Sequence, residues 1–254
     1  MNNESVIARI RQNLASKGII KGNEIATQGY LRLGVNVQTT LNTISFNVLQ
    51  NQGTILGTER RLNVTDMFTV THWALYLVKA GTTTTADSAA VSVARNYTYP
   101  NPYVFSTAAP GAPTFLANGA ASANNPQTTE SNNMYSIYNG FISVTIDREV
   151  VIDSYDNLRF LRVPASQQQM NQGAVTAPAA GVIAGSAGAT FDQWESANYG
   201  FSEVDPQFTL NGIGDNNITI TLPTPVSLAG ASSTNFVFMQ LRGIRWQNAS
   251  KLNA

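Results

Sequence analysis

The chain has 254 residues, of which 43% are hydrophobic and only 12% are Asp, Glu, Lys or Arg. The hydrophobic fraction excludes a disordered chain, whereas the charged fraction is about half of the roughly 25% that is usual for soluble domains. The absence of cysteine excludes disulfides, zinc–thiolate sites and thiol catalysis. So few charges favour a subunit that buries much of its outside against neighbours, because uncharged polar groups cost less to desolvate than ions.

The first predicted element is an amphipathic helix over residues 5–17, part of an N-terminal arm of residues 1–23. Apolar residues recur on one helix face at Val6, Ile7, Ile10 and Leu14, and Gly18 follows as a C-terminal cap. The arm carries four cations that suit lipid or nucleic-acid phosphates, namely Arg9, Arg11, Lys17 and Lys21. We expect the helix to dock on its own domain, on a neighbouring copy or on a membrane surface. In the alternative interpretation, the cations only solvate the chain end.

After the arm, the pattern changes to strands. Strict alternation of apolar and polar residues predicts a half-buried strand over residues 31–37, and a second strand follows over residues 44–49. Residues 67–78 are rich in β-branched and aromatic side chains without strict alternation. This composition predicts a longer strand that is covered on both faces.

The middle of the chain contains its clearest alternating pattern, over residues 141–153. We predict one continuous strand there, with Arg148 as the exception on its apolar face. A further strand is predicted over residues 158–163, where Pro164 stops it.

The last predicted strands surround a glycine-rich turn at residues 212–216. Phe208 and Leu210 lead into this turn, and an alternating strand returns from it and ends at Pro223. Residues 236–241 are almost continuously apolar, which indicates a central strand.

These segments predict roughly twelve to sixteen strands and one helix, without alternating strand–helix units. This pattern is typical of the all-β class, either a sandwich or a barrel. Two stretches without any charged residue, 106–129 and 164–190, interrupt the strands. Loops of this length in a compact domain are usually functional or lie at interfaces, so we expect neighbouring subunits to order them.

Candidate catalytic or metal-binding residues are few. We place the single histidine, His72, on the same strand face as Phe68 and Tyr76, which favours a packed, hydrogen-bonded role. Asp147 and Glu149 lie two residues apart on a polar strand face; such a pair suits a glycosidase or a calcium site, but it is more often plain surface. We therefore predict no catalytic residue, no cofactor, no bound metal and no small-molecule substrate.

An aromatic cluster surrounds two prolines near residue 100. It consists of Tyr97, Tyr99, Tyr103 and Phe105. Aromatic loops of this kind bind sugars or anchor interfaces, so we regard the cluster as a candidate loop interface. The alternative is that the rings pack over the end of a sandwich.

Several short segments, spread over most of the chain, carry a family resemblance. They are residues 59–66, 138–145, 158–160, 163–164 and 241–244, in addition to the helical arm. In this order they resemble the major capsid proteins of small tailless, lipid-containing phages with single-stranded DNA that infect Bacteroidota-type hosts.

The resemblance implies a viral-type jelly-roll fold, with two upright sandwiches over residues 24–125 and 126–254 favoured over one elaborated sandwich. It implies a structural protein that assembles as trimers into an icosahedral virion shell in the host cytoplasm. Its partners would be copies of itself, other virion proteins and the headgroups of an internal membrane. The alternative function is a phage spike or decoration protein, or a carbohydrate-binding module. A third is a glycosidase that uses Asp147 or Glu149.

Overall fold

The computed structural model describes residues 3–20, 24–37, 40–80, 96–100, 105, 130–163, 200–226 and 234–249. In chain order, its elements are α1 (Asn3–Ser16), β1 (Ile25–Asn36), β2 (Leu41–Phe46), β3 (Met67–Ala80), β4 (Asn96–Tyr97), α3 (Glu130–Tyr138), β5 (Phe141–Ile146), β6 (Glu149–Asp156), the 3₁₀-helix η1 (Asn157–Phe160), β7 (Ser202–Asn211), β8 (Asn216–Val226) and β9 (Thr234–Gln247). The uncharged stretches 106–129 and 164–190 lie outside the described residues.

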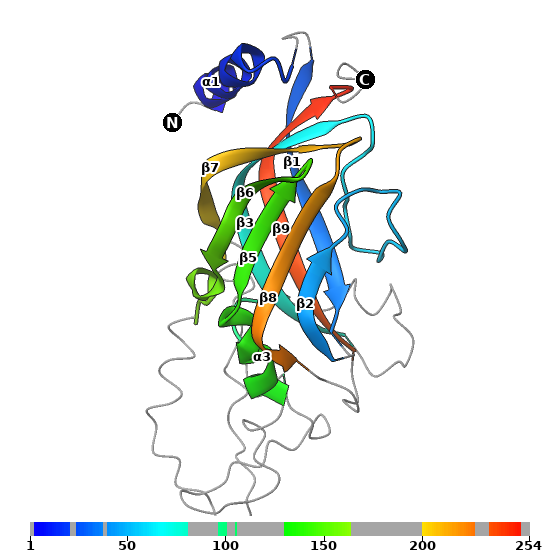
Figure 1. Ribbon diagram of the computed structural model, residues 1–254, viewed down its shortest axis with the longest axis vertical. Helices are drawn as coiled ribbons and strands as arrows, with labels where there is room; N and C mark the ends of the chain where they lie inside the picture. The colour runs from blue at the N-terminus through cyan, green and yellow to red at the C-terminus, as the bar shows by residue number, and fades with distance from the viewer. Residues whose placement is uncertain are drawn as a thin grey trace, which may run out of the picture.

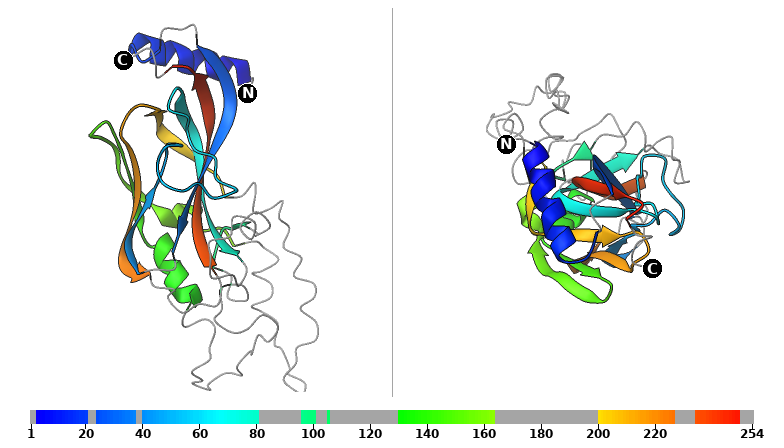
Figure 2. Two further views of the ribbon diagram at one scale, coloured as in Figure 1. Left: turned by 90° about the vertical axis from the view of Figure 1, so that its right-hand side faces the viewer. Right: turned by 90° about the horizontal axis from the view of Figure 1, so that it is seen from above.

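The described strands form two antiparallel sheets that face each other (Figures 1 and 2). In the five-stranded sheet β1 pairs with β9 and β9 with β3, and both β4 and β7 pair with the other edge of β3. The four-stranded sheet has the order β2-β8-β5-β6. The predicted all-β sandwich is thereby confirmed.

The pairing is nested along the chain. β1 pairs with β9, β2 with β8, β3 with β7 and β5 with β6, so the chain folds like one long hairpin whose innermost pair is β5–β6. Pairing of β9 with β3 and of β8 with β5 joins these pairs into the two sheets. The boundary that we expected between residues 125 and 126 therefore runs through both sheets, and the described strands build one sandwich.

The main core lies between the two sheets. Leu33, Trp73 and Phe208 enter it from the five-stranded sheet, and Ile44 and Ile220 enter it from the four-stranded sheet. The Trp73 ring makes edge contacts with the rings of Tyr155, Phe160 and Phe208, with centroids 4.6, 5.7 and 6.1 Å away. Edge-to-face contacts of this kind add to the stabilisation from burial.

The outer face of the five-stranded sheet is buried as well. Tyr76, Phe236 and Phe238 form a separate apolar cluster there, against which Leu56 and Phe201 pack. β3 is thus covered on both faces, as its composition predicts, and β9 lies between β1 and β3 as the expected central strand.

A bulge in β3 changes the predicted position of the histidine. Val70 pairs with Gly243 and His72 with Arg242, so Thr71 is an extra residue in β3. Beyond the bulge the alternation changes phase. His72 is therefore exposed, and its Nδ1 lies 3.1 Å from Thr71 Oγ1. The predicted packing beside Phe68 was wrong.

Residues 141–156 form a hairpin where we predicted one continuous strand. β5 and β6 pair with each other across a turn at Asp147 and Arg148, whose φ angles are +50° and +71°. Two consecutive residues with positive φ are the signature of a type I′ hairpin turn. The apolar alternation continues through the turn by coincidence of sequence, which is why it resembled one strand.

Two further expectations are corrected near the ends of strands. Residues 157–160 form η1 and not a strand, because the Asp156 side chain accepts a hydrogen bond from the Leu158 amide and starts a helical turn. The turn at residues 212–216 does not close a hairpin, since β7 pairs with β3 and β8 pairs with β2 and β5. β8 also continues past Pro223, in a region where its register with β2 shifts.

Helix α1 lies across one end of the sandwich, opposite to α3 (Figures 1 and 2). Its apolar residues Ile10 and Leu14 pack with Met67, Ile244 and Trp246 at the ends of β3 and β9. Gly18 has φ +69°, the left-handed conformation expected of a C-terminal cap. The predicted helix and its cap are confirmed, and the helix docks on its own sandwich.

Candidate interaction site

The loop between β2 and β3, residues 47–66, attaches to the outer edge of β1. Arg32 and Arg60 exchange two backbone hydrogen bonds of 2.8 and 2.9 Å. Two residues further along β1, the Gly34 amide donates to Glu59 Oε1 at 2.8 Å. The loop thus pairs with the free edge of the five-stranded sheet at one isolated antiparallel bridge, between Arg32 and Arg60.

A buried ion pair fixes this loop. Arg61 Nη2 lies 2.8 Å from Glu59 Oε2, and both side chains are almost fully buried. Glu59 also accepts from the Leu56 amide, and Arg61 also donates to the carbonyls of Gln52 and Thr54. Because the carboxylate and the guanidinium have partners on several atoms, the pair holds the loop in one conformation and offsets its own desolvation.

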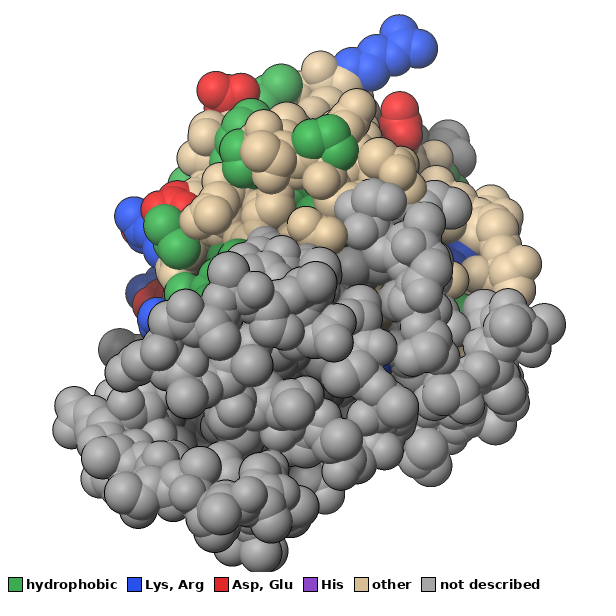
Figure 3. All heavy atoms as spheres, turned by 90° about the horizontal axis from the view of Figure 1, so that it is seen from below, with side chains coloured by type: hydrophobic (Ala, Val, Ile, Leu, Met, Phe, Trp, Pro, Cys, Tyr) green, Lys and Arg blue, Asp and Glu red, His purple; other side chains and the backbone are tan. Residues whose placement is uncertain are grey.

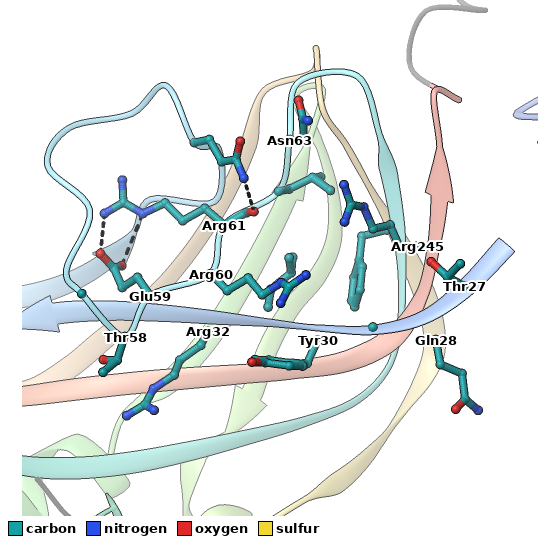
Figure 4. Close-up of a pocket in the computed structure, with 16 residues that line it drawn as sticks. Thr27, Gln28, Tyr30, Arg32, Thr58, Glu59, Arg60, Arg61, Asn63 and Arg245 are labelled. Atoms are coloured by element: carbon teal, nitrogen blue, oxygen red, sulfur yellow. Dashed lines mark hydrogen bonds and ion pairs between the residues drawn. The ribbon is translucent and has the colours of Figure 1, made fainter. Parts of the chain in front are cut away.

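A pocket of about 740 Å³ lies below the bridge, between β1 and this loop (Figure 4). Arg60 crosses β1 within it, and its guanidinium lies 5.3 Å from the centroid of the Tyr30 ring. Arg60 is exposed, and Tyr30 is 51% exposed. Arg245 lies on the other side of the pocket, where its Nε donates to Asp66 Oδ2 at 2.6 Å.

Arg32 points to the opposite side of β1, toward the outer apolar cluster (Figure 4). Its guanidinium lies 4.4 Å from the centroid of Phe238 and donates to Asn96 Oδ1 at 3.0 Å. Burial lowers the pKa of Arg32 from its ordinary value, and nearby Tyr30, Tyr76 and Glu59 act in the opposite direction. Burial likewise raises the pKa of Tyr76 to about 12. The Tyr76 hydroxyl therefore stays protonated near neutral pH, and both side chains serve the packing of this face.

The charge of the pocket is positive. Arg61 is neutralised by Glu59 and Arg245 by Asp66, and no carboxylate among the described residues forms an ion pair with Arg60. An exposed guanidinium stacked near an aromatic ring suits a carboxylate or a phosphate, which it can bind with two parallel hydrogen bonds. The pocket can therefore bind an anionic group.

The backbone of β1 is open beside this pocket. Arg32 directs its N–H and C=O away from β9, and in an antiparallel strand Tyr30 and Gln28 direct theirs the same way. Between Ile25 and Leu31, no described residue pairs with that edge of β1. An edge strand with unpaired backbone groups is a template for another extended segment.

On β2, β8 and β5, the outer face of the four-stranded sheet is polar and carries no charged side chain. Strands β2, β8 and β5 place their outward side chains in cross-strand rows: Thr43, Thr221 and Phe141 in one row, and Ser45, Thr219 and Ser143 in the next. Figure 3 shows the end of the sandwich opposite α1, where tan and green predominate on the described surface and charged side chains lie mainly along its margins. A hydroxyl-rich sheet face is inexpensive to cover with another protein surface.

The structure buries the described members of the aromatic cluster. Tyr97, Tyr99 and Phe105 are 7%, 5% and 0% exposed, and the rings of Tyr97 and Phe105 contact each other at 5.6 Å. Tyr103 lies outside the described residues. For the three described residues, this burial favours packing at the sandwich over the candidate loop interface. Their rings fill core volume and leave no exposed platform for a ligand.

The four cations of the arm have different surroundings. Arg9 and Lys17 are exposed on α1. Arg11 is half-buried, donates to the Glu24 carbonyl at 3.1 Å and lies 5.7 Å from the centroid of Trp246. Lys21 lies outside the described residues. Arg11 thus belongs to the docking of α1, whereas Arg9 and Lys17 are available to a partner.

The paired acids of the sequence do not form a shared site. Asp147 lies in the hairpin turn and accepts from the Asp215 amide at 2.9 Å, whereas Glu149 begins β6. Both are exposed. Within the described residues, no three His, Asp or Glu side chains gather as ligands for a metal ion.

The pocket beside β1 was not predicted from the sequence, although several of its residues stand together there. The segment 59–61 contains an acid followed by two arginines in a chain with very few charges. That local concentration of charge was a usable signal. What it did not reveal is that Glu59 pairs with Arg61 and leaves Arg60 free, because this depends on how the loop folds against β1.

Comparisons of the chain with protein families, with curated proteins and with solved structures found no match. The resemblance to phage capsid proteins therefore stays a prediction. Among the described residues, no helix has both the length and the hydrophobicity that a membrane crossing requires.

Proposed function

We propose that this chain is a structural capsid protein whose sandwich is a single viral-type jelly roll. The observation that carries the proposal is the nested pairing of eight strands, β1·β9, β2·β8, β3·β7 and β5·β6. A long hairpin wrapped into two facing four-stranded layers is the topology of a jelly roll, which occurs in viral capsid and lectin domains. Because a fold alone does not decide the function, the surfaces must separate these classes.

The interior and the loops favour a shell protein over a binding module. Large side chains such as Trp73, Phe160 and Phe208 fill the space between the sheets. The described aromatic residues near residue 100 are buried, so they offer no platform on which a sugar ring could stack. These observations favour self-assembly over a spike or carbohydrate-binding role.

The uncharged face of the four-stranded sheet supports contacts between subunits. Thr219 lies at its centre, between Ser45 and Ser143. Burying hydroxyl groups that find new hydrogen bonds costs little, whereas burying an unpaired ion costs several kcal/mol. In this proposal, copies of the chain associate as trimers that tile an icosahedral shell. Other virion proteins, or headgroups of an internal membrane beside Arg9 and Lys17, complete the set of partners.

Solution size and electron microscopy test the proposal. We expect the purified chain to sediment as a trimer or larger assembly at micromolar concentration, and to form closed particles in negative stain. Thr219→Lys should prevent the closed particles while trimers and the β circular dichroism are retained, because the new ammonium would be buried where trimers meet. Thr219→Ala is the matched control and should assemble normally. A wild-type chain that stays monomeric at every concentration would exclude a capsid role.

A further inference from the structure

The two lateral edges of the sandwich carry different charges. β1 and β2 lie at one edge, and β6 and β7 lie at the opposite edge (Figure 1). Five exposed carboxylates lie on β6 and β7, and we call this set the acidic edge: Glu149, Asp153, Asp156, Glu203 and Asp205. None of them forms an ion pair with another described residue.

Few cations compensate the acidic edge. Arg148 and Arg159 are exposed beside β6, and the Arg159 guanidinium lies over the Tyr155 ring at 5.2 Å. Arg242 is the cation nearest to Glu203 in the strand register, and it stacks on Phe201 at 3.7 Å. Arg162, exposed after η1, is a fourth arginine near this edge, so five carboxylates face four arginines and the edge keeps a small negative charge.

The opposite edge keeps a positive charge. It contains the pocket beside β1, in which Glu59 and Asp66 are already paired with Arg61 and Arg245. Arg60 remains exposed and lacks an ion-pair partner among the described residues. The potentials of the two edges are therefore complementary, which is the condition for steered association between copies.

Both edges also end in a strand with one free side. β1 has open backbone groups at Gln28 and Tyr30, and β6 pairs only with β5 among the described strands. Edge strands that are left open are sites of pairing between chains. The two edges thus carry opposite charges, and each offers a strand with unpaired backbone groups to the other.

From this match we infer that the pocket beside β1 receives the acidic edge of a second copy, with Arg60 bound to a carboxylate of β6. This inference rests on the proposed self-assembly and names the contact that would produce it. Because the two surfaces lie on opposite sides of one chain, the contact is head-to-tail. Repetition of a head-to-tail contact closes a trimer when successive copies are rotated by about 120°, and it gives an open chain otherwise.

Charge reversal on each side tests the contact. Arg60→Glu and Asp153→Arg should each raise the concentration at which trimers form by at least tenfold, as measured by sedimentation. The double variant should assemble again, because the reversed charges attract each other once more. The matched control is Arg9→Glu on α1, which makes the same change of charge away from the contact and should leave the trimer intact.

The outcomes separate this contact from the proposed function. If the wild-type chain assembles and both reversals assemble equally well, the edge contact is wrong while the capsid role stands. If the wild-type chain never assembles, both fail. Loss of binding to a single-stranded oligonucleotide in Arg60→Glu, with assembly unchanged, would show that the pocket binds nucleic acid and would overturn the inference. Failure of the double variant to recover, with a normal circular dichroism spectrum, would overturn it as well.

Discussion

At the scale of single residues, Gly243 decides whether β3 and β9 can pair across the bulge. Thr71 is the extra residue of β3, and its Oγ1 donates to the Arg242 carbonyl at 3.1 Å. A Cβ atom on Gly243 would collide with the carbonyl oxygen of Thr69. The backbones of the two strands therefore approach more closely here than a side chain allows, which is a known use of glycine inside a strand.

We predict that Gly243→Ala destabilises the protein by about 3 kcal/mol or prevents its folding, because the collision is with backbone and cannot be relieved by a side-chain rotation. Gly29 is the matched control. It pairs with Gly243 across the strands, but a Cβ there would meet Phe68 and Arg245 side chains at 3.5 and 3.6 Å, an ordinary contact. Urea unfolding of both variants measures the difference. Equal midpoints for the two would show that the bulge adapts.

Single residues also show which parts of the fold and of the site could be predicted from the sequence. Alternation identified the second half of β1, where the buried residues alternate with partly exposed ones, but not the first six residues from Ile25. It placed His72 wrongly, because a bulge changes the phase and depends on Gly243 in another strand. The free charge of Arg60 was likewise unpredictable, since the loop fold decides which arginine Glu59 neutralises.

At the scale of elements, local signals determined which segments were recognised. Helix α1 was predictable because its periodicity and its glycine cap are both local. The β5–β6 hairpin was missed because its turn uses Asp147 and Arg148 in left-handed conformations, without the Asn-Gly or Asp-Gly pair that normally marks such a turn. Helix α3 was missed too. It is held by a contact distant in sequence, since its Ser136 hydroxyl donates to the Thr224 carbonyl of β8 at 2.9 Å.

The docking of α1 can be tested as a separate element. Leu14→Ala should release the helix, because Leu14 is 6% exposed and packs in the small cluster around Trp246. Truncation of a buried leucine typically costs about 2–5 kcal/mol, and a cluster this small cannot absorb that loss. Hydrogen exchange should show lost protection in residues 3–16, with the protection of β3 and β9 unchanged.

Gln12→Ala is the control for this experiment, since Gln12 is exposed on the same helix and alanine favours helix formation. It should keep the protection of residues 3–16. If Leu14→Ala unfolds the whole sandwich instead, α1 is part of the core and not a docked arm.

At the scale of the whole molecule, the pairing partners lie far apart in the sequence. β1 at residues 25–36 pairs along its length with β9 at residues 234–247. No local pattern predicts which strand pairs with which, because many strands of the chain have similar alternating sequences. This is why the all-β class could be predicted while the division into two sandwiches at residues 125 and 126 did not match the described strands.

The nested topology makes a last prediction about the two halves of the chain. Residues 24–125 alone would keep β1, β2 and β3, but each of these loses its long partner, since β8 and β9 lie in the other half. Residues 126–254 alone would keep β5, β6 and β8 as one sheet whose apolar face has no opposite layer. A sheet cannot bury that face without a second layer. We therefore expect neither fragment to unfold cooperatively, by circular dichroism in urea, whereas the full chain does. A cooperative transition in either fragment would mean that the half is an independent domain, and that the nested pairing is not what holds the sandwich together.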